Sequence, residues 1–206
     1  MADASGAPVD PRAPHDFTPE RYAGADGAPV YRIKPATLLE RIAFRAALTE
    51  AAGQYPSDAA LIAAMREAID QIDQADRETA SAILADYEAA LAARDAAVKA
   101  RLPDEETPAV PPDLAEAFSR LVGLCEVSGV VRSILAARER RLMTSLYLAA
   151  QRFLAGWSGT DLPRFRRERA GVPADLLDAL PEEDVLAAGA RALALMAPTE
   201  AQLGNS

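Results

Sequence analysis

Few residues in this chain have the chemistry that catalysis or metal binding requires. It contains one histidine, His15, and one cysteine, Cys125. A histidine beside a nucleophile would indicate acyl transfer, and several His and Cys residues together would indicate a zinc site. His15 instead stands alone between Pro14 and Asp16 in a stretch rich in Ala, Pro and Gly. We interpret it as a solvated side chain, so the sequence predicts neither a hydrolytic triad nor a metal site.

Two charged clusters are the remaining candidates. The acids from Glu182 to Asp184 follow Pro181, and this order is typical of a helix start, where acids complement the N-terminal dipole. Residues 164–169 hold four arginines around Phe165. Because the net charge is -9, we expect these arginines to pair with acids of the same chain rather than with RNA. With no phosphate-binding or calcium-binding motif, the sequence predicts a non-enzymatic protein without catalytic residues, cofactor or metal.

The composition indicates which elements must position any site. Hydrophobic residues make up 50% of the chain but aromatic residues only 5%, and Ala and Leu dominate. Such a sequence favours helices over strands, so we predict an all-α protein. The acidic balance argues against nucleic acid, and no apolar run reaches the roughly 18 residues that a membrane span needs. A single cysteine and the absence of a signal peptide favour the cytoplasm.

Composition also divides the chain into four parts. Residues 1–29 are rich in Ala, Pro, Gly and Asp without any period, so we expect a disordered N-terminal arm. Residues 30–101 form the N-terminal helical region and residues 113–206 the C-terminal one. Between them, residues 102–112 contain four prolines and three acids and read as a Pro-rich linker. Within the first region, residues 30–34 alternate apolar and basic side chains and predict only an isolated extended segment.

Capping signals locate the N-terminal helices. Thr37 and Glu40 form a capping box, which predicts a helix to about residue 52 that ends at Gly53. Ser57 begins the next helix, whose apolar stripe runs to residue 101 without Gly or Pro. One long helix and two helices separated near residues 73–76 both fit this stripe.

The C-terminal helices are marked in the same way. Asp113 and Glu116 predict a second capped start, and a later helix is expected from about residue 130 to residue 155. That helix runs out at the only tryptophan, Trp157, which we expect to fold back over the helix end. A loop and two short helices, starting at Pro173 and at Pro181, should follow.

Because the sequence predicts no catalytic residues, we considered which helix faces could bind a partner. The helix face around Leu142, Leu146 and Phe153 and the thin stripe on an alanine-rich helix are our candidates for binding a partner or a second copy. For the aromatic residues near the helix end, anchoring of the following loop is the alternative that we favour. The complete set of candidates for partner binding or loop anchoring is Leu142, Leu146, Phe153, Trp157, Phe165, Ile83, Tyr87 and Leu91.

Four short motifs follow one another in the final third of the chain. They are FLAGWSG at residues 153–159, a Leu-Pro step at 162–163, LPEED at 180–184 and LMAPTE at 195–200. Together they resemble the tail assembly chaperones of tailed bacteriophages and prophages, in which a helix ends at a Gly-Trp turn, a variable loop follows and a Leu-Pro step begins the last helix. The early motifs YRIKP and TLLER are also similar to the opening of such phage proteins.

The resemblance implies a non-enzymatic role in virion assembly, in the host bacterial cytoplasm. It implies binding to the long tape measure protein before the tail tube polymerises around it, with the tail tube protein as a further expected partner. The alternative is a structural minor tail or adaptor component that is retained in the virion. A host helical adaptor of unrelated role is the third hypothesis.

Overall fold

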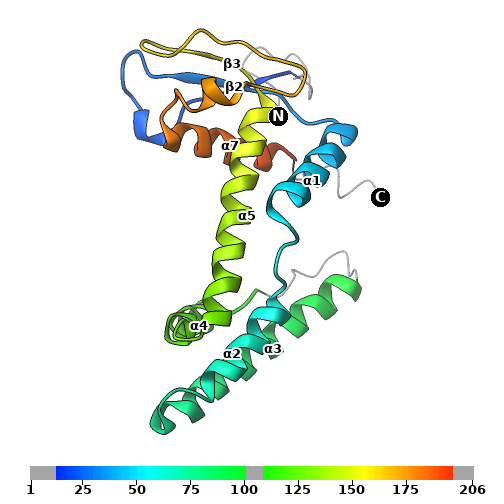
Figure 1. Cartoon of the computed structure of the whole chain (residues 1–206), viewed down its shortest axis with the longest axis vertical. Helices are drawn as coiled ribbons and strands as arrows, with labels where there is room; N and C mark the ends of the chain where they lie inside the picture. The colour runs from blue at the N-terminus through cyan, green and yellow to red at the C-terminus, as the bar shows by residue number, and fades with distance from the viewer. Residues whose placement is uncertain (1–12, 101–108, 197–206) are drawn as a thin grey trace. The chain divides into compact units, whose positions relative to one another are not determined.

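The computed structural model describes residues 13–100 and 109–196, and within these ranges the chain is predominantly helical, as predicted (Figure 1). None of the helices in these ranges combines the length and the apolar content that crossing a membrane requires. The α-helices are α1 (Leu38–Ala52), α2 (Asp58–Ile69), α3 (Gln74–Ala100), α4 (Pro112–Cys125), α5 (Gly129–Phe153), α6 (Ala174–Leu177) and α7 (Glu182–Met196).

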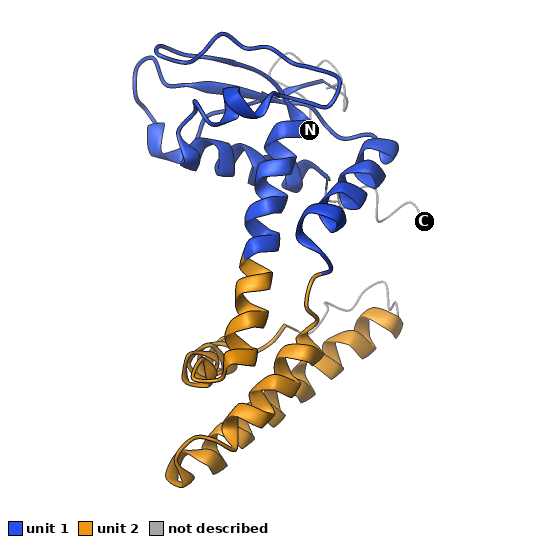
Figure 2. Cartoon of the chain, viewed as in Figure 1, with its two compact units in different colours: residues 1–54, 140–206 blue, residues 55–139 orange. Residues whose placement is uncertain are grey.

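The chain divides into two compact units (Figure 2). Unit 1 combines Met1–Gln54 with Arg140–Ser206, and unit 2 is Tyr55–Glu139. These units differ from the two regions that flank residues 102–112 in the sequence, because each unit takes segments from both sides of the predicted linker. Most of that linker, residues 102–108, lies outside the described residues.

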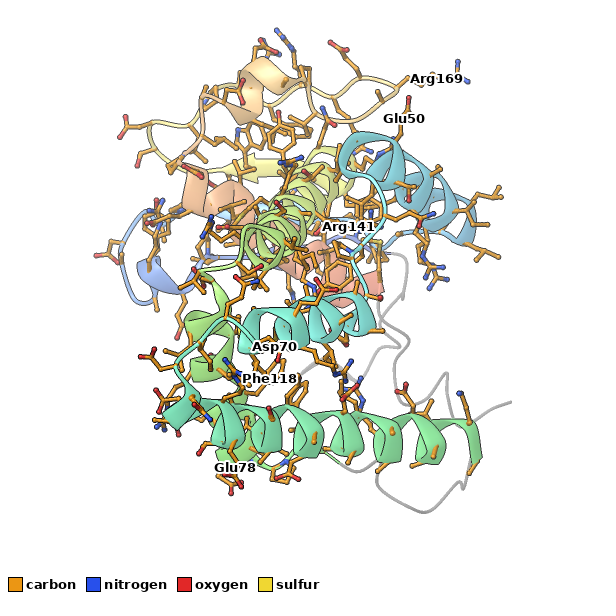
Figure 3. The ribbon with its side chains drawn as sticks, turned by 60° about the horizontal axis from the view of Figure 1, so that its bottom comes forward. Glu50, Asp70, Glu78, Phe118, Arg141 and Arg169 are labelled. Atoms are coloured by element: carbon orange, nitrogen blue, oxygen red, sulfur yellow. The ribbon has the colours of Figure 1, made fainter. Side chains whose placement is uncertain are left out.

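The core of unit 2 forms where α2, α3, α4 and the first turns of α5 meet. Met65, Cys125 and Val131 are fully buried at its centre. Tyr87 of α3 stacks on Phe118 of α4, with ring centroids 3.6 Å apart and planes within 5° of parallel, and Figure 3 labels Phe118 in this unit. The stripe on α3 that we considered for binding a partner therefore packs against another helix of the same unit.

The stripe that follows Ser57 is broken into two helices. The Ser57 hydroxyl accepts from the Ala60 amide at 3.1 Å and caps α2, as predicted. Between α2 and α3, the Arg77 guanidinium donates to the carbonyl oxygens of Asp70 and Ile72 at 2.8 and 3.1 Å. Carbonyls at the end of α2 thus find a side-chain donor instead of the next helical amide, which stabilises the break.

The predicted cap at Asp113 is not formed. Helix α4 begins one residue earlier, at Pro112, and has no side-chain cap. The Ala115 amide already donates to the Pro111 carbonyl at 2.9 Å. Proline at the first helical position has its φ preset and lacks an amide that needs a cap, so it can start the helix unaided.

Unit 1 contains a small antiparallel sheet that the all-α prediction did not include. Its strands are β1 (His15–Phe17), β2 (Val30–Ile33) and β3 (Leu154–Ser158), in the order β1-β2-β3. Across the second pair, Tyr31 lies opposite Trp157, and a bulge falls between Arg32 and Ile33. The segment predicted to be isolated is therefore the central strand, and the residues after Phe153 form a strand rather than a turn.

The sheet also corrects the predicted disordered arm. Residues 1–12 of that arm lie outside the described residues. Beyond them, β1 pairs with β2, and a 3-10 helix, η1 (Glu20–Tyr22), follows. This ordering depends on a distant partner strand, which composition alone does not reveal.

Helices α1, α5 and α7 pack with the sheet around the core of unit 1. Phe153 at the end of α5 is 1% exposed, and its ring lies 5.9 Å from the ring of Phe44. At the start of α1, Thr37 and Glu40 form the reciprocal capping box, and the helix ends at Gly53, so both predictions are confirmed. These local signals fix the α1 boundaries, while the apolar core fixes its orientation within the unit.

Candidate partner-binding groove

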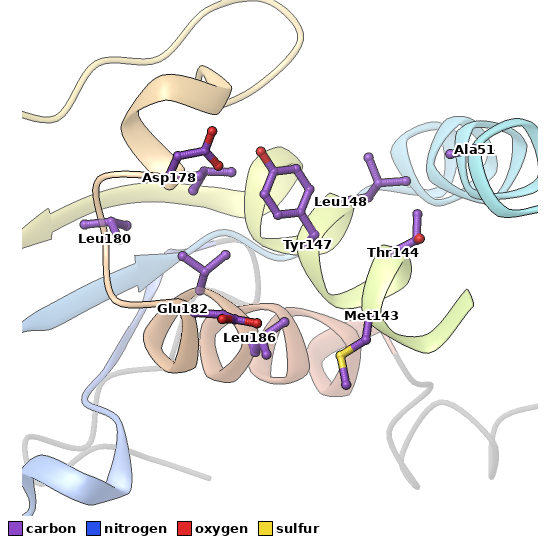
Figure 4. Close-up of a pocket in the computed structure, with 11 residues that line it drawn as sticks. Ala51, Met143, Thr144, Tyr147, Leu148, Asp178, Leu180, Glu182 and Leu186 are labelled. Atoms are coloured by element: carbon purple, nitrogen blue, oxygen red, sulfur yellow. The ribbon is translucent and has the colours of Figure 1, made fainter. Parts of the chain in front are cut away.

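Unit 1 contains a groove of about 690 Å³ between α5, α6 and α7 (Figure 4). We call it the α5–α7 groove. Its lining residues are Ala51, Met143, Thr144, Tyr147, Leu148, Leu177, Asp178, Leu180, Glu182, Val185 and Leu186.

The floor of the groove is apolar and firmly packed. Leu177, Leu180 and Val185 are each at most 6% exposed and belong to the core of unit 1. Tyr147 and Leu148 form one wall from α5, and half-buried Leu186 forms the other from α7. A partner in the groove would therefore meet aliphatic and aromatic surface held by the core beneath it.

The rim of the groove adds exposed apolar surface and negative charge. Met143 is 42% exposed, and its neighbour Leu142 on α5 is 53% exposed. Asp178 and Glu182 are exposed, and they are the only charged residues among those that line the groove. The α5–α7 groove is thus an apolar groove edged by two carboxylates.

One phenol marks the polar end of the groove. Burial, and after it the negative charge of Asp178, raises the pKa of Tyr147 above its ordinary value. Figure 4 shows the Tyr147 hydroxyl and the Asp178 carboxylate at the same end of the groove. The phenol therefore stays protonated at neutral pH and can donate a hydrogen bond to a partner's backbone carbonyl.

A buried carboxylate holds the start of α7, one wall of the groove, in place. Asp184 is fully buried, and the Tyr31 hydroxyl donates to its Oδ2 at 2.7 Å, with Tyr22 donating to the same atom at 3.2 Å. The Arg21 guanidinium lies 2.8 Å from Oδ1, in an ion pair that is not aligned as a hydrogen bond, and donates to Glu183 at 2.6 Å. These contacts tie α7 to β2 and η1.

The sequence missed this role for Asp184. The run of acids at residues 182–184 is indeed at the start of α7, where Glu182 and Glu183 are exposed. Nothing in the run distinguishes the one acid that is buried. The residues that follow the run carry the signal, because Asp184 lies four residues before Ala188 and eight before Ala192, on the side of α7 that enters the core.

None of the eight candidate residues from the sequence lines the groove. Leu142 lies beside it, whereas the backbone of Leu146 lies against α7, since its carbonyl oxygen would be 2.1 Å from a Cβ placed on Gly189. Phe153 is a core residue and cannot belong to an exposed face. The groove residues Tyr147 and Leu148 lie on the helix that the sequence selected, but only the fold of α6 and α7 onto that helix shows their use.

The aromatic candidates near the helix end hold a loop. Trp157 and Phe165 meet edge to face, with ring centroids 4.7 Å apart. The Trp157 Nε1 donates to the Pro163 carbonyl at 2.6 Å. This is the geometry of the loop-anchoring alternative, and both side chains are half-buried against the unit 1 core.

The candidates on α3 belong to the other unit. Ile83, Tyr87 and Leu91 are half-buried against the unit 2 core. The sequence candidates therefore fall into separate groups, some in unit 1 and some in unit 2.

The groove offers groups that can bind a partner. Its polar side chains are a hydroxyl, a phenol and two carboxylates, which accept or donate hydrogen bonds at the edge of an apolar surface. Across residues 13–100 and 109–196, no three His, Cys, Asp or Glu side chains gather in a way that could hold a metal ion. Comparisons with protein-family models, with curated proteins and with solved structures find no match to this chain.

Proposed function

We propose that this chain is a non-enzymatic tail assembly chaperone of a tailed phage or prophage, which binds the tape measure protein and assists tail tube assembly in the cytoplasm of the host bacterium. The observation that carries the proposal is the apolar α5–α7 groove with its acidic rim. The motifs in the final third of the chain supply the phage context, and the groove supplies a place to bind a helical client.

The shape of the groove suits one face of an amphipathic helix. Such a helix presents apolar side chains at spacings of three and four, and a groove with an apolar floor buries that stripe. Here the floor is formed by Leu177, Leu180 and Val185, and Met143 extends the apolar surface beyond the rim. A long helical client that exposes such stripes aggregates by itself, so covering them keeps it in solution.

The charge of the groove selects the kind of helix that fits. Asp178 and Glu182 edge the apolar floor, and the whole chain carries a net charge of -9. Lysine or arginine residues beside the apolar stripe of the client would meet these carboxylates, whereas acidic residues there would be repelled. The client segment should therefore be both apolar and basic.

Co-expression with the tape measure protein of the same genome tests this proposal. The soluble fraction of the tape measure protein should rise, and the two proteins should co-purify. Met143→Glu should abolish both effects, because it puts a charge where the apolar stripe of the client would pack. Leu124→Glu is the matched control, since Leu124 is an apolar residue that is 58% exposed on α4 of unit 2.

Three outcomes would count against the proposal. An equally insoluble tape measure protein with and without this chain would exclude a chaperone role towards it. Equal loss of binding in Met143→Glu and Leu124→Glu, with both variants folded by circular dichroism, would exclude the groove as the site. Stoichiometric amounts of the chain in purified virions would favour the structural tail component instead.

A further inference from the structure

A second pocket in unit 1 has three arginines among its seven lining residues. It has a volume of about 100 Å³ and lies among the first half of α1, the last turn of α5 and the loop before α6. We call it the arginine pocket. Its lining residues are Glu40, Ala43, Arg152, Phe153, Arg167, Arg169 and Ala170.

Two of the arginines are placed by the backbone at the end of α5. Arg167 donates to the carbonyl oxygen of Leu154 and, at 2.7 Å, to that of Arg152. Arg169 follows in a tight turn closed by backbone hydrogen bonds of 2.8 and 3.2 Å between Glu168 and Gly171. Both guanidinium groups are therefore presented by segments fixed to α5.

Gly171 explains how closely this turn approaches the helix. It has a φ of 136°, and a Cβ there would lie 2.2 Å from the Gln151 carbonyl oxygen. Only glycine permits this approach, and the next amide, that of Val172, donates to the same oxygen at 2.8 Å. The turn that carries Arg169 is thus held against α5 by its own backbone.

The arginines of the pocket keep unused binding capacity. The sequence predicted that the arginines of residues 164–169 pair with acids, and Arg166 does so with Asp175 at 2.7 Å. Among the described residues, Arg152, Arg167 and Arg169 have no acidic partner, and the buried Nε of Arg152 has no hydrogen-bond acceptor. Arg169, which lines the pocket, is exposed to solvent and lies at the edge of unit 1 in Figure 3.

The one acid that lines the pocket is already engaged. The Glu40 carboxylate accepts hydrogen bonds from the Lys34 ammonium and, at 3.0 Å, from the amide and hydroxyl of Thr37. Burial acts to raise the pKa of Glu40, but these hydrogen bonds outweigh burial and hold the pKa below its ordinary value. Glu40 therefore neutralises Lys34, and the pocket keeps a positive charge in a chain whose net charge is -9.

Exposed apolar side chains adjoin the pocket on α1. Leu39 is 77% exposed and Ile42 is 54% exposed. Leu39 lies one helical turn before Ala43, a pocket residue, so the two share a face of α1. A positive pocket beside an uncovered apolar face is the complement of a segment that carries an acid beside an apolar stripe.

We propose that the arginine pocket and the adjoining face of α1 dock an acidic amphipathic helix of a partner protein. One carboxylate of that helix enters the pocket and is bound by Arg152 and Arg169, and its apolar stripe covers Leu39 and Ile42. The volume holds a single small oxyanion, and guanidinium groups bind carboxylates in a two-pronged geometry. A polyanion fits less well, because the chain as a whole carries a net charge of -9 and would repel the charges that lie outside the pocket.

This surface is separate from the α5–α7 groove and selects the opposite charge. The two pockets share no lining residue. The inference does not depend on the identity of the tape measure protein as the client, and it would hold for a protein with another primary partner.

The test uses fluorescently labelled 16-residue helical peptides that share one apolar stripe and differ beside it, where they carry Glu, Gln or Lys. Binding to the full chain is followed by fluorescence anisotropy at fixed ionic strength. We expect the Glu peptide to bind about tenfold more tightly than the Gln peptide, and Arg169→Gln to remove this difference. Leu39→Gln should weaken both peptides, because it removes apolar contact that they share.

Arg164→Gln is the matched control, since Arg164 is exposed on the same loop and does not line the pocket. It should leave all affinities unchanged. Equal binding of the Glu and Gln peptides, or an undiminished preference for Glu in Arg169→Gln, would overturn the proposal. A third result would also overturn it. If inorganic phosphate binds wild type and Leu39→Gln equally well while the Glu peptide binds neither protein, the pocket binds a free anion and not a helix.

Discussion

Replacement of Gly189 by alanine tests how closely α7 approaches α5. A Cβ at this position would lie 2.1 Å from the carbonyl oxygen of Leu146, 2.7 Å from its carbonyl carbon and 2.9 Å from its Cα. All three are backbone atoms, so no side-chain rotation can relieve the overlap. Because protein interiors are close-packed, the two helices would have to separate by more than about 1 Å.

Two opposing effects set the size of the loss. Alanine in a helix interior is favoured over glycine by about 1 kcal/mol. Overpacking of a core costs about 1 to 3 kcal/mol, and the upper end applies here because backbone must move. We therefore expect Gly189→Ala to lower the free energy of unfolding by about 2 kcal/mol, which corresponds to a fall of about 1 M in the urea midpoint.

The single tryptophan makes the assay specific for unit 1. Trp157 lies in β3, so its fluorescence during urea unfolding reports on the unit that contains Gly189. Gly156→Ala is the control in the same unit, since its Cβ would meet nothing nearer than 3.7 Å. Gly123→Ala on α4, with no atom within 4 Å, should be neutral or gain up to about 1 kcal/mol. A Gly189→Ala midpoint equal to or above wild type would refute the close helix approach.

Other residues give further predictions. Tyr31→Phe should lower the free energy of unfolding in urea by about 1 to 3 kcal/mol, because buried Asp184 loses its 2.7 Å donor, and an unchanged midpoint would show that the hydrogen bond contributes nothing. Burial, then the hydrogen bond to Asp184 and its charge, raises the pKa of Tyr31. The unfolded phenol ionises near pH 10 while the folded one stays protonated, so stability should be full below about pH 10 and fall above it, less steeply in Tyr31→Phe. Burial also raises the pKa of the Cys125 thiol, so a thiol reagent should label the native protein only as it opens, and rapid labelling would contradict its place in the core.

The helices themselves follow from local sequence. The capping box of Thr37 and Glu40, the cap at Ser57 and the stop at Gly53 each involve neighbouring residues, and each has the predicted effect. A helical hydrogen bond joins residues four apart, so the signals that begin and end a helix are contained in a short window. Helix propensity is likewise a property of single residues, so the composition alone was sufficient to predict a predominantly helical chain.

The break in the long apolar stripe shows where local signals become ambiguous. Periodicity allowed both one helix and two, since the stripe continues past residues 73–76. The contacts of Arg77 with carbonyls at the end of α2 stabilise two helices. Such a contact depends on the position of a side chain after folding, which a periodic pattern does not specify.

The two proposed binding surfaces could not be predicted from the sequence, because each is made of segments that are distant along it. Tyr31 becomes a core residue only because β2 pairs with β3, and pairing between strands so far apart in the sequence has no local signature. The α5–α7 groove likewise requires α6 and α7 to fold onto the final turns of α5, and the arginine pocket requires the loop before α6 to meet α1. The sequence thus determined the helices and their charge, while tertiary packing alone decided which side chains are buried, which remain exposed and which meet.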